Sequence, residues 1–142
     1  MKPLYTTSAK ATSGRQGNAQ SDDGLLNVEL AYPKELGGNG GATNPEQMFA
    51  AGYAACFSNA VLHIARETKV AIKQAPVSAN VSLYQNEQGG FVLGVALAAE
   101  VDLPQEDAEK LVLTAHQVCP YSNAVKGNID VRLTVNGQEI AA

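Results

Sequence analysis

The stretch that decides the fold is residues 43–67, which read TNPEQMFAAGYAACFSNAVLHIARE. The pair Asn44-Pro45 supplies a favourable N-cap and a residue suited to the first helical position, and Gln47 stands where a capping-box side chain reaches back to the cap. From Phe49 to Phe57 the sequence is apolar or small on every side, which is typical of a helix buried at the centre of a protein. We therefore expect a long central helix with Cys56 at its middle.

Strand patterns lie on both sides of this helix. Before it, the sequence predicts a small antiparallel sheet whose strands are residues 4–13, 18–21 and 26–30. After it, the sequence predicts a long hairpin, a second helix, a short third helix and a closing strand, at residues 77–83 with 91–101, 104–118, 121–126 and 129–135. The fold class is therefore α+β, with two small antiparallel sheets around a long buried central helix plus a second helix. Because one chain supplies too little cover for a helix that is apolar on every face, we expect a homodimer.

Composition limits the classes of function. A chain of 142 residues with 45% hydrophobic and 17% charged residues is expected to form one domain, residues 1–142, with a real core. Its formal net charge of −4 argues against a phosphate-binding surface of the kind that nucleic-acid-binding proteins carry. No apolar run approaches the ~20 residues that span a bilayer, and the N-terminus has no signal-peptide pattern. We expect a cytoplasmic protein that binds neither nucleic acid nor membrane.

The two cysteines, Cys56 and Cys119, have two interpretations. Cytosolic thiols are kept reduced, so a permanent disulfide is disfavoured while a transient catalytic one is compatible with the sequence. Their spacing fits no C-x-x-C redox or zinc pattern. Free cysteine is also among the most buried residue types, so both residues could serve as small hydrophobic filler.

A reactive Cys56 would need a cation, because burial alone raises the pKa of a thiol. Arg66 and Lys69 lie roughly 15 and 20 Å further along the helix at ~1.5 Å per residue, too far to act directly. Arg15, framed by glycines in the segment Gly14-Arg15-Gln16-Gly17, is the strongest candidate. A buried arginine needs a carboxylate to orient it, and Glu46 is the candidate, although a first-turn glutamate also simply stabilises the helix dipole.

Glu46 and Cys56 are themselves about 15 Å apart along the helix axis. They form one compact site only if the arginine spans most of that gap or if one of the two residues comes from a partner subunit. This spacing again favours a dimer.

Three separated segments of the chain resemble those of a known family. They are GRQG at residues 14–17, TNPEQ through GYAACF within residues 43–57, and VCPYSNA at residues 118–124. In this order they are similar to the organic hydroperoxide resistance proteins, a branch of the osmotically inducible protein C superfamily. The resemblance covers essentially the whole chain.

The resemblance implies a thiol peroxidase for organic hydroperoxides that needs no cofactor. Cys56 would be the peroxidatic cysteine and Cys119 the resolving cysteine that forms a disulfide with it, with Arg15 and Glu46 as the activating pair. It further implies an intertwined dimer with active sites at the subunit interface, and recycling by dihydrolipoyl groups, on lipoylated proteins or as dihydrolipoamide. A preference for organic peroxides would agree with the apolar residues near the thiol, Met48, Phe49, Tyr53 and Phe57.

Three alternatives remain at the level of the sequence. A zinc site could use both cysteines and both histidines, Cys56, His63, His116 and Cys119. However, Cys56 and His63 are seven residues apart, which is about 10 Å along a helix and too far for one zinc ion to bridge. We therefore expect no metal. The other two are a dimer that binds hydrophobic ligands without catalysis and a peroxidase of the osmotically inducible protein C type.

Overall fold

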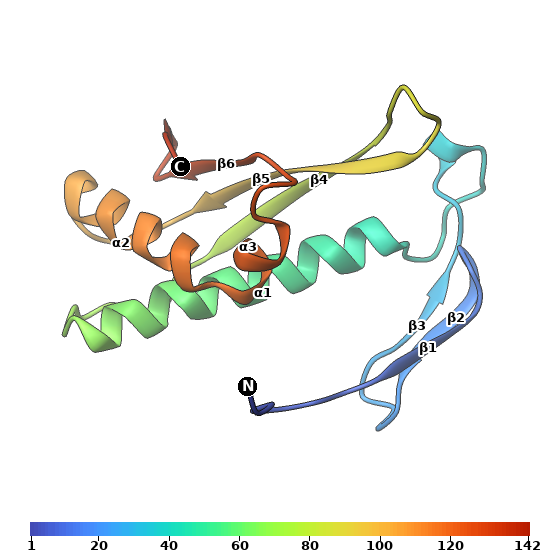
Figure 1. Cartoon of the computed structure of the whole chain (residues 1–142), viewed down its shortest axis with the longest axis horizontal. Helices are drawn as coiled ribbons and strands as arrows, with labels where there is room; N and C mark the ends of the chain where they lie inside the picture. The colour runs from blue at the N-terminus through green and yellow to red at the C-terminus, as the bar shows by residue number, and fades with distance from the viewer. The chain divides into compact units, whose positions relative to one another are not determined.

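The structure is a computed structural model that describes all residues, 1–142, and the chain divides into two compact units, residues 1–48 and 49–142. The elements in chain order are shown in Figure 1. They are β1 (Ala9–Ser13), β2 (Gln16–Ser21), β3 (Asn27–Leu30), the 3-10 helix η1 (Lys34–Leu36), α1 (Pro45–Glu67), β4 (Val77–Gln85), β5 (Phe91–Ala99), α2 (Gln105–Val118), α3 (Pro120–Val125), β6 (Val131–Val135) and β7 (Gln138–Ile140). The predicted α+β class is confirmed, whereas the expectation of a single domain stays a prediction.

The first unit contains a three-stranded antiparallel sheet in the order β1-β2-β3. Its first strand begins at Ala9, later than predicted, and η1 was not predicted. Gly14 and Arg15 form the two-residue turn between β1 and β2, and Gly14 has a φ of 63°, which suits a hairpin turn with glycine at its first central position. Leu30 and Asn44 are the buried residues of this unit, so residues 1–48 enclose almost no core of their own.

Local interactions define both ends of α1. The side chain of Asn44 accepts a hydrogen bond of 2.8 Å from the backbone N–H of Gln47, as the predicted N-cap requires. The predicted reach of the Gln47 side chain back to the cap is wrong, because its Oε1 accepts instead from the Thr43 hydroxyl at 2.7 Å. At the other end, Lys69 has a φ of 58° and the N–H of Val70 donates to the carbonyl that lies five residues earlier, which is a Schellman termination.

The second unit is built on a four-stranded sheet in the order β4-β5-β6-β7. The prediction of two antiparallel sheets holds for the first sheet only, because β5 and β6 pair in parallel. Parallel neighbours need a crossover connection, and α2 and α3 provide it between these two strands. Strand β7, which was not predicted, pairs antiparallel with β6 through the turn at Asn136-Gly137.

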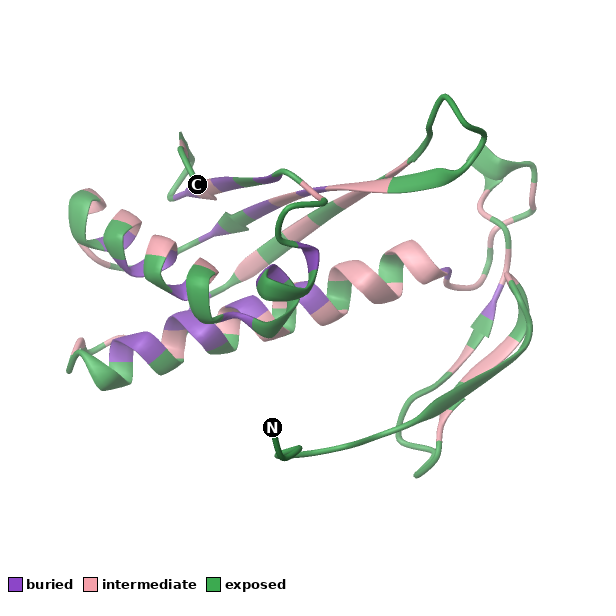
Figure 2. Cartoon of the chain, viewed as in Figure 1, coloured by how far each residue is buried: buried purple, intermediate pink, exposed green.

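One face of this sheet and the adjoining sides of α1 and α2 form the hydrophobic core. Alternate residues of β5 and β6 point into it, namely Val95, Leu97, Ala99, Val131, Leu133 and Val135. Figure 2 shows the buried positions gathered on α1, α2, α3 and these strands. The helices therefore cover the apolar side of the sheet and place the α2–α3 junction beside the middle of α1.

Helix α1 is buried along only part of its surface. The side chains that enter the core lie between residues 53 and 65, and they are Tyr53, Phe57, Ala60, Val61, Ile64 and Ala65. By length and composition α1 is long and apolar enough to cross a membrane, but the core helix of a soluble protein meets the same criteria. About a third of its most apolar 18 residues are buried within the chain. The expected burial on every face is thus not provided by one chain.

Candidate active site

The two cysteines, distant in sequence, are neighbours in the second unit. Cys56 lies on α1 and is partly buried, whereas Cys119 is fully buried, and both are free thiols. Cys119 ends α2 and is the N-cap residue of α3, with φ −64° and ψ 124°, because the following Pro120 disfavours helical geometry at the residue before it. The sequence pattern therefore fixes a sharp corner at Cys119, and the packing of α3 on α1 brings that corner to Cys56.

The surroundings of Cys56 within this unit keep its thiol protonated. Burial raises the pKa of Cys56 above its ordinary value of 9.0, and the adjoining thiol of Cys119 raises this pKa further. The backbone N–H of Tyr121 acts in the opposite direction by hydrogen bonding to the Cys56 sulfur. The net direction is upward, so activation of this thiol at neutral pH requires an additional positive charge.

Three aromatic rings, two on α1 and one on α3, pack on one another close to the cysteine pair in sequence. The rings of Phe49 and Tyr53 meet edge to face with centroids 6.1 Å apart, and Tyr121 lies 6.1 Å from Phe49 and 5.6 Å from Tyr53. Gly52 makes this packing feasible, because a Cβ there would lie 2.6 Å from the Tyr121 hydroxyl oxygen. The site wall beside Cys56 is therefore apolar.

Two of the apolar residues expected near the thiol, Tyr53 and Phe57, are fully buried and belong to the core. Phe49 is partly buried and packs against Tyr121, which is 37% exposed. Sequence reasoning did not single out Tyr121. Its position directly after the Cys119-Pro120 corner is the signal that could have identified it.

Arg15 and Glu46 form a two-pronged ion pair in the first unit. The guanidinium Nη1 and Nη2 donate to the two carboxylate oxygens of Glu46 at 2.7 and 2.8 Å, with side-chain exposures of 23% and 18%. The hydrogen bonds from Arg15 lower the pKa of Glu46, and the same bonds raise the pKa of Arg15. Both groups therefore stay charged across the physiological pH range, and the guanidinium plane is fixed.

The four predicted site residues thus form two pairs, one in each unit. The expected orientation of Arg15 by Glu46 is seen directly, as is the proximity of Cys56 to Cys119. The action of the arginine on the thiol stays a prediction.

The histidines have partners other than the cysteines. His63 Nε2 lies 3.3 Å from a Glu67 carboxylate oxygen, and His116 Nδ1 is hydrogen bonded to the Ser122 hydroxyl at 2.8 Å. No group of three or more His, Cys, Asp or Glu side chains is placed to hold a metal ion.

The motifs that suggested a family can now be compared with known proteins. Residues 38–134 match the family described as OsmC-like protein. The chain belongs to the OsmC-like family. Relatives named organic hydroperoxide resistance proteins are 44% to 48% identical to this chain over more than 90% of its length. The chain therefore falls in that branch of the family, and the assignment drawn from the three sequence segments is confirmed.

Individual relatives of this OsmC-like protein align over nearly their whole length. The organic hydroperoxide resistance protein of Xanthomonas axonopodis pv. citri is 48% identical over 137 residues, which cover 94% of this chain and 96% of the relative. A crystal structure of a Vibrio cholerae chain, with captopril bound in one of the active sites, is 61% identical with a TM-score of 0.97, covering 99% of this chain and 97% of the other. The organic hydroperoxide resistance protein of Elizabethkingia anophelis is 50% identical with a TM-score of 0.90, covering 95% and 98%.

Proposed function

We propose that this chain is a thiol-dependent peroxidase that reduces organic hydroperoxides, such as alkyl and fatty-acid hydroperoxides, to alcohols. Membership of the organic hydroperoxide resistance branch supports the substrate class, since relatives such as that of Xanthomonas axonopodis are named for it. The observation that carries the chemistry is the contact between Cys56 and Cys119, two thiols far apart in sequence that meet in a largely apolar site. A pair placed in this way suits reversible disulfide formation better than two unrelated core positions would.

In the first step the Cys56 thiolate attacks the outer oxygen of ROOH. The S–O bond forms, the O–O bond breaks, and the alkoxide leaves as ROH after it takes a proton, so that Cys56 becomes a sulfenic acid. Arg15 stabilises both the thiolate and the charge that develops on the leaving alkoxide. Glu46 keeps the guanidinium in a fixed plane through its two hydrogen bonds.

In the second step Cys119 resolves the sulfenic acid. Its sulfur displaces the hydroxyl group of Cys56-SOH, which leaves as water with the proton of the Cys119 thiol, and the Cys56–Cys119 disulfide forms. This step protects Cys56 from irreversible oxidation to sulfinic and sulfonic acids. A dithiol then restores the enzyme through a mixed disulfide, and we propose that dihydrolipoyl groups, free or on a lipoylated protein, supply the two electrons and become the cyclic disulfide.

The preference for organic substrates follows from the wall beside Cys56. Phe49, which is partly buried, and the exposed part of Tyr121 offer aromatic surface to an alkyl chain and no fixed charge. Transfer of each buried methylene from water to such surface is worth about 0.8 kcal/mol. Hydrogen peroxide gains none of this energy.

We further propose that the active protein is a homodimer, with residues 1–142 acting as one cytoplasmic domain. Only about a third of the most apolar 18 residues of α1 are buried by its own chain, and the first unit has almost no core, so both gain cover from a second copy. Glu46 and Cys56 stand about 15 Å apart along α1, which is consistent with an arginine that reaches the thiol either along its own chain or across the dimer.

Turnover of tert-butyl hydroperoxide with dihydrolipoamide as the reductant tests this proposal. The wild-type protein should consume peroxide and dithiol in equal amounts and form tert-butanol, whereas Cys56→Ser should be inactive. A wild-type protein whose thiols are unchanged by excess peroxide would contradict the peroxidase and favour a dimer that binds hydrophobic ligands without catalysis.

A further inference from the structure

A chain of hydrogen bonds joins three helices close to the cysteine pair. The Tyr53 hydroxyl and the Ser122 hydroxyl lie 2.8 Å apart, and Ser122 is also 2.8 Å from His116 Nδ1. These residues belong to α1, α3 and α2 respectively. Tyr53 is fully buried and Ser122 is 3% exposed, so bulk water does not compete for the bond between these two residues.

The residues of this hydrogen-bond chain are in register with the two thiols. Tyr53 precedes Cys56 by three residues on α1, and Ser122 follows Cys119 by three residues at the start of α3. Residues three apart lie on the same face of a helix. The bond between Tyr53 and Ser122 therefore ties α1 to α3 one turn away from the point where the two cysteines meet.

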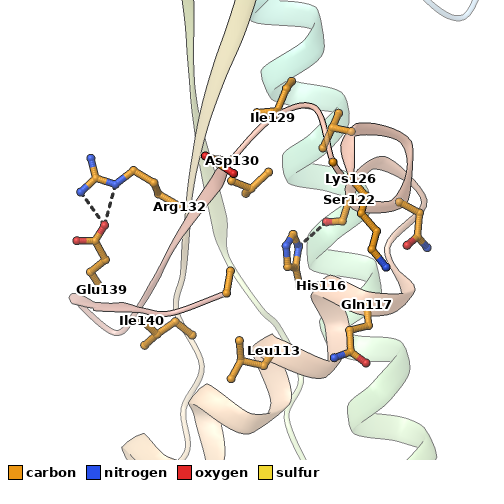
Figure 3. Close-up of a pocket in the computed structure, with 15 residues that line it drawn as sticks. Leu113, His116, Gln117, Ser122, Lys126, Ile129, Asp130, Arg132, Glu139 and Ile140 are labelled. Atoms are coloured by element: carbon orange, nitrogen blue, oxygen red, sulfur yellow. Dashed lines mark hydrogen bonds and ion pairs between the residues drawn. The ribbon is translucent and has the colours of Figure 1, made fainter.

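His116 is the last residue of the hydrogen-bond chain and lines a pocket. The pocket has a volume of about 810 Å³ and lies between α2, α3, β6 and β7. Figure 3 shows the imidazole and the Ser122 side chain directed toward one another beside it. The other face of His116 packs near Phe57, with ring centroids 6.2 Å apart, so the imidazole is held by α1 as well as by α3.

We propose that Tyr53, Ser122 and His116 are positioning residues that hold Cys119 in register with Cys56 and thereby favour the disulfide. A disulfide requires an S–S separation of about 2.05 Å and a narrow range of dihedral angles, so small shifts of α3 against α1 affect its formation strongly. The role assigned to these residues rests on the proposed function. It concerns the disulfide step and not the attack on peroxide.

The test measures the equilibrium between the reduced protein and its Cys56–Cys119 disulfide in buffers of reduced and oxidised glutathione. In this exchange two protein thiols are oxidised as one molecule of oxidised glutathione is reduced to two thiols, and the equilibrium constant is the effective concentration of one cysteine at the other. The variants are Tyr53→Phe and Ser122→Ala, which remove single hydroxyl groups with little change of shape. Each should lower the effective concentration about threefold to tenfold, the change expected for the loss of one buried neutral hydrogen bond.

Ser58→Ala is the matched control. Ser58 is also a partly buried hydroxyl residue on α1 near Cys56, but it donates to the Ala75 carbonyl at 2.6 Å and not to α3. It should leave the glutathione equilibrium unchanged. Effective concentrations in Tyr53→Phe and Ser122→Ala that match the Ser58→Ala value, in proteins that melt cooperatively, would overturn the proposal.

Variants of His116 separate positioning from a proton-transfer role. His116→Asn retains a hydrogen-bonding group near the place of Nδ1 without a titratable ring, and His116→Ala removes it. If His116 acts by positioning, the asparagine variant should keep most of the wild-type effective concentration. After correction for glutathione ionisation, this effective concentration should not change between pH 6 and 8 in either the variant or the wild type. An asparagine variant as impaired as the alanine variant would exclude this role for His116.

The failure of this inference can be distinguished from failure of the proposed function. The glutathione equilibrium uses no peroxide. It therefore reports on the role of Tyr53, Ser122 and His116 even if the protein does not reduce peroxides. Conversely, a protein that reduces hydroperoxides but shows equal equilibria in all variants would keep the proposed function and lose the positioning role.

Discussion

Replacement of Arg15 by alanine should shift the ionisation of Cys56. Within its own unit this thiol has a pKa raised above 9.0, so less than about 1% of it would be ionised at pH 7. The two-pronged bond to Glu46 keeps Arg15 charged. In the proposed mechanism this guanidinium approaches the thiol, and a guanidinium within ~4–6 Å lowers such a pKa by about 1–3 units. Arg15→Ala should therefore reduce the thiolate fraction of Cys56 about 10- to 1000-fold at pH 7.

The assay is the rate of alkylation by iodoacetamide as a function of pH, in a Cys119→Ser background that leaves one thiol. Arg15→Ala should give a midpoint above 9, since loss of the cation leaves burial unopposed, and the wild-type arginine should give a midpoint about 1–3 units lower. Arg132→Ala is the matched control, because Arg132 also pairs with a glutamate, at 2.6 Å, on the surface of β6. Equal midpoints above 9 with and without Arg15 would refute the reasoning.

Three further changes have defined outcomes. Cys119→Ser should permit a single oxidation of Cys56 and then accumulate sulfinic acid, measured by mass spectrometry after excess hydroperoxide; sustained multiple turnover at the wild-type rate would exclude the resolving role. Gly52→Ala should displace the ring of Tyr121 and lower the free energy of unfolding in urea by about 1 kcal/mol. Helix propensity alone predicts that this free energy rises by a similar amount, and such a rise would mean that the ring does not pack on Gly52. The pKa of Glu46 is lowered on folding, so its ion pair should stabilise the folded protein above pH 4.5. This contribution to the unfolding free energy should disappear as the pH falls through the folded pKa. Glu46→Gln should remove that part of the acid dependence of the unfolding free energy.

Local signals in the sequence were sufficient for most elements. Asn44-Pro45 predicts the start of α1, and Pro120 predicts the corner that ends α2 at Cys119. The alternating apolar residues around Gly89-Gly90 predict the hairpin of β4 and β5. In each case the deciding interaction involves residues close together in the chain, so a pattern read along the sequence contains it.

Three packing features that depend on distant residues were not predicted. The parallel pairing of β5 with β6 is set by how the α2–α3 crossover packs, and an alternating pattern is the same in parallel and antiparallel strands. Strand β7 has only three residues and little apolar character, so its pairing with β6 defines it. The contact of Tyr121 with Gly52 likewise appears only once α3 is placed against α1.

For the site, residue types and motif order predicted the Arg15–Glu46 pair that the structure contains. The cysteine pair followed from the family resemblance and not from spacing, because nothing in the interval between Cys56 and Cys119 encodes a contact. The hydrogen bonds of Ser122 were missed, although its place one turn after Cys119 was a usable signal.

The most direct test of the central claim is the intact mass of the reduced protein after one equivalent of an alkyl hydroperoxide. A thiol peroxidase with a resolving cysteine should lose two hydrogen atoms per chain, release one equivalent of alcohol, and give a proteolytic fragment in which the peptides of Cys56 and Cys119 are cross-linked. An unchanged mass with both thiols still titratable would contradict the account.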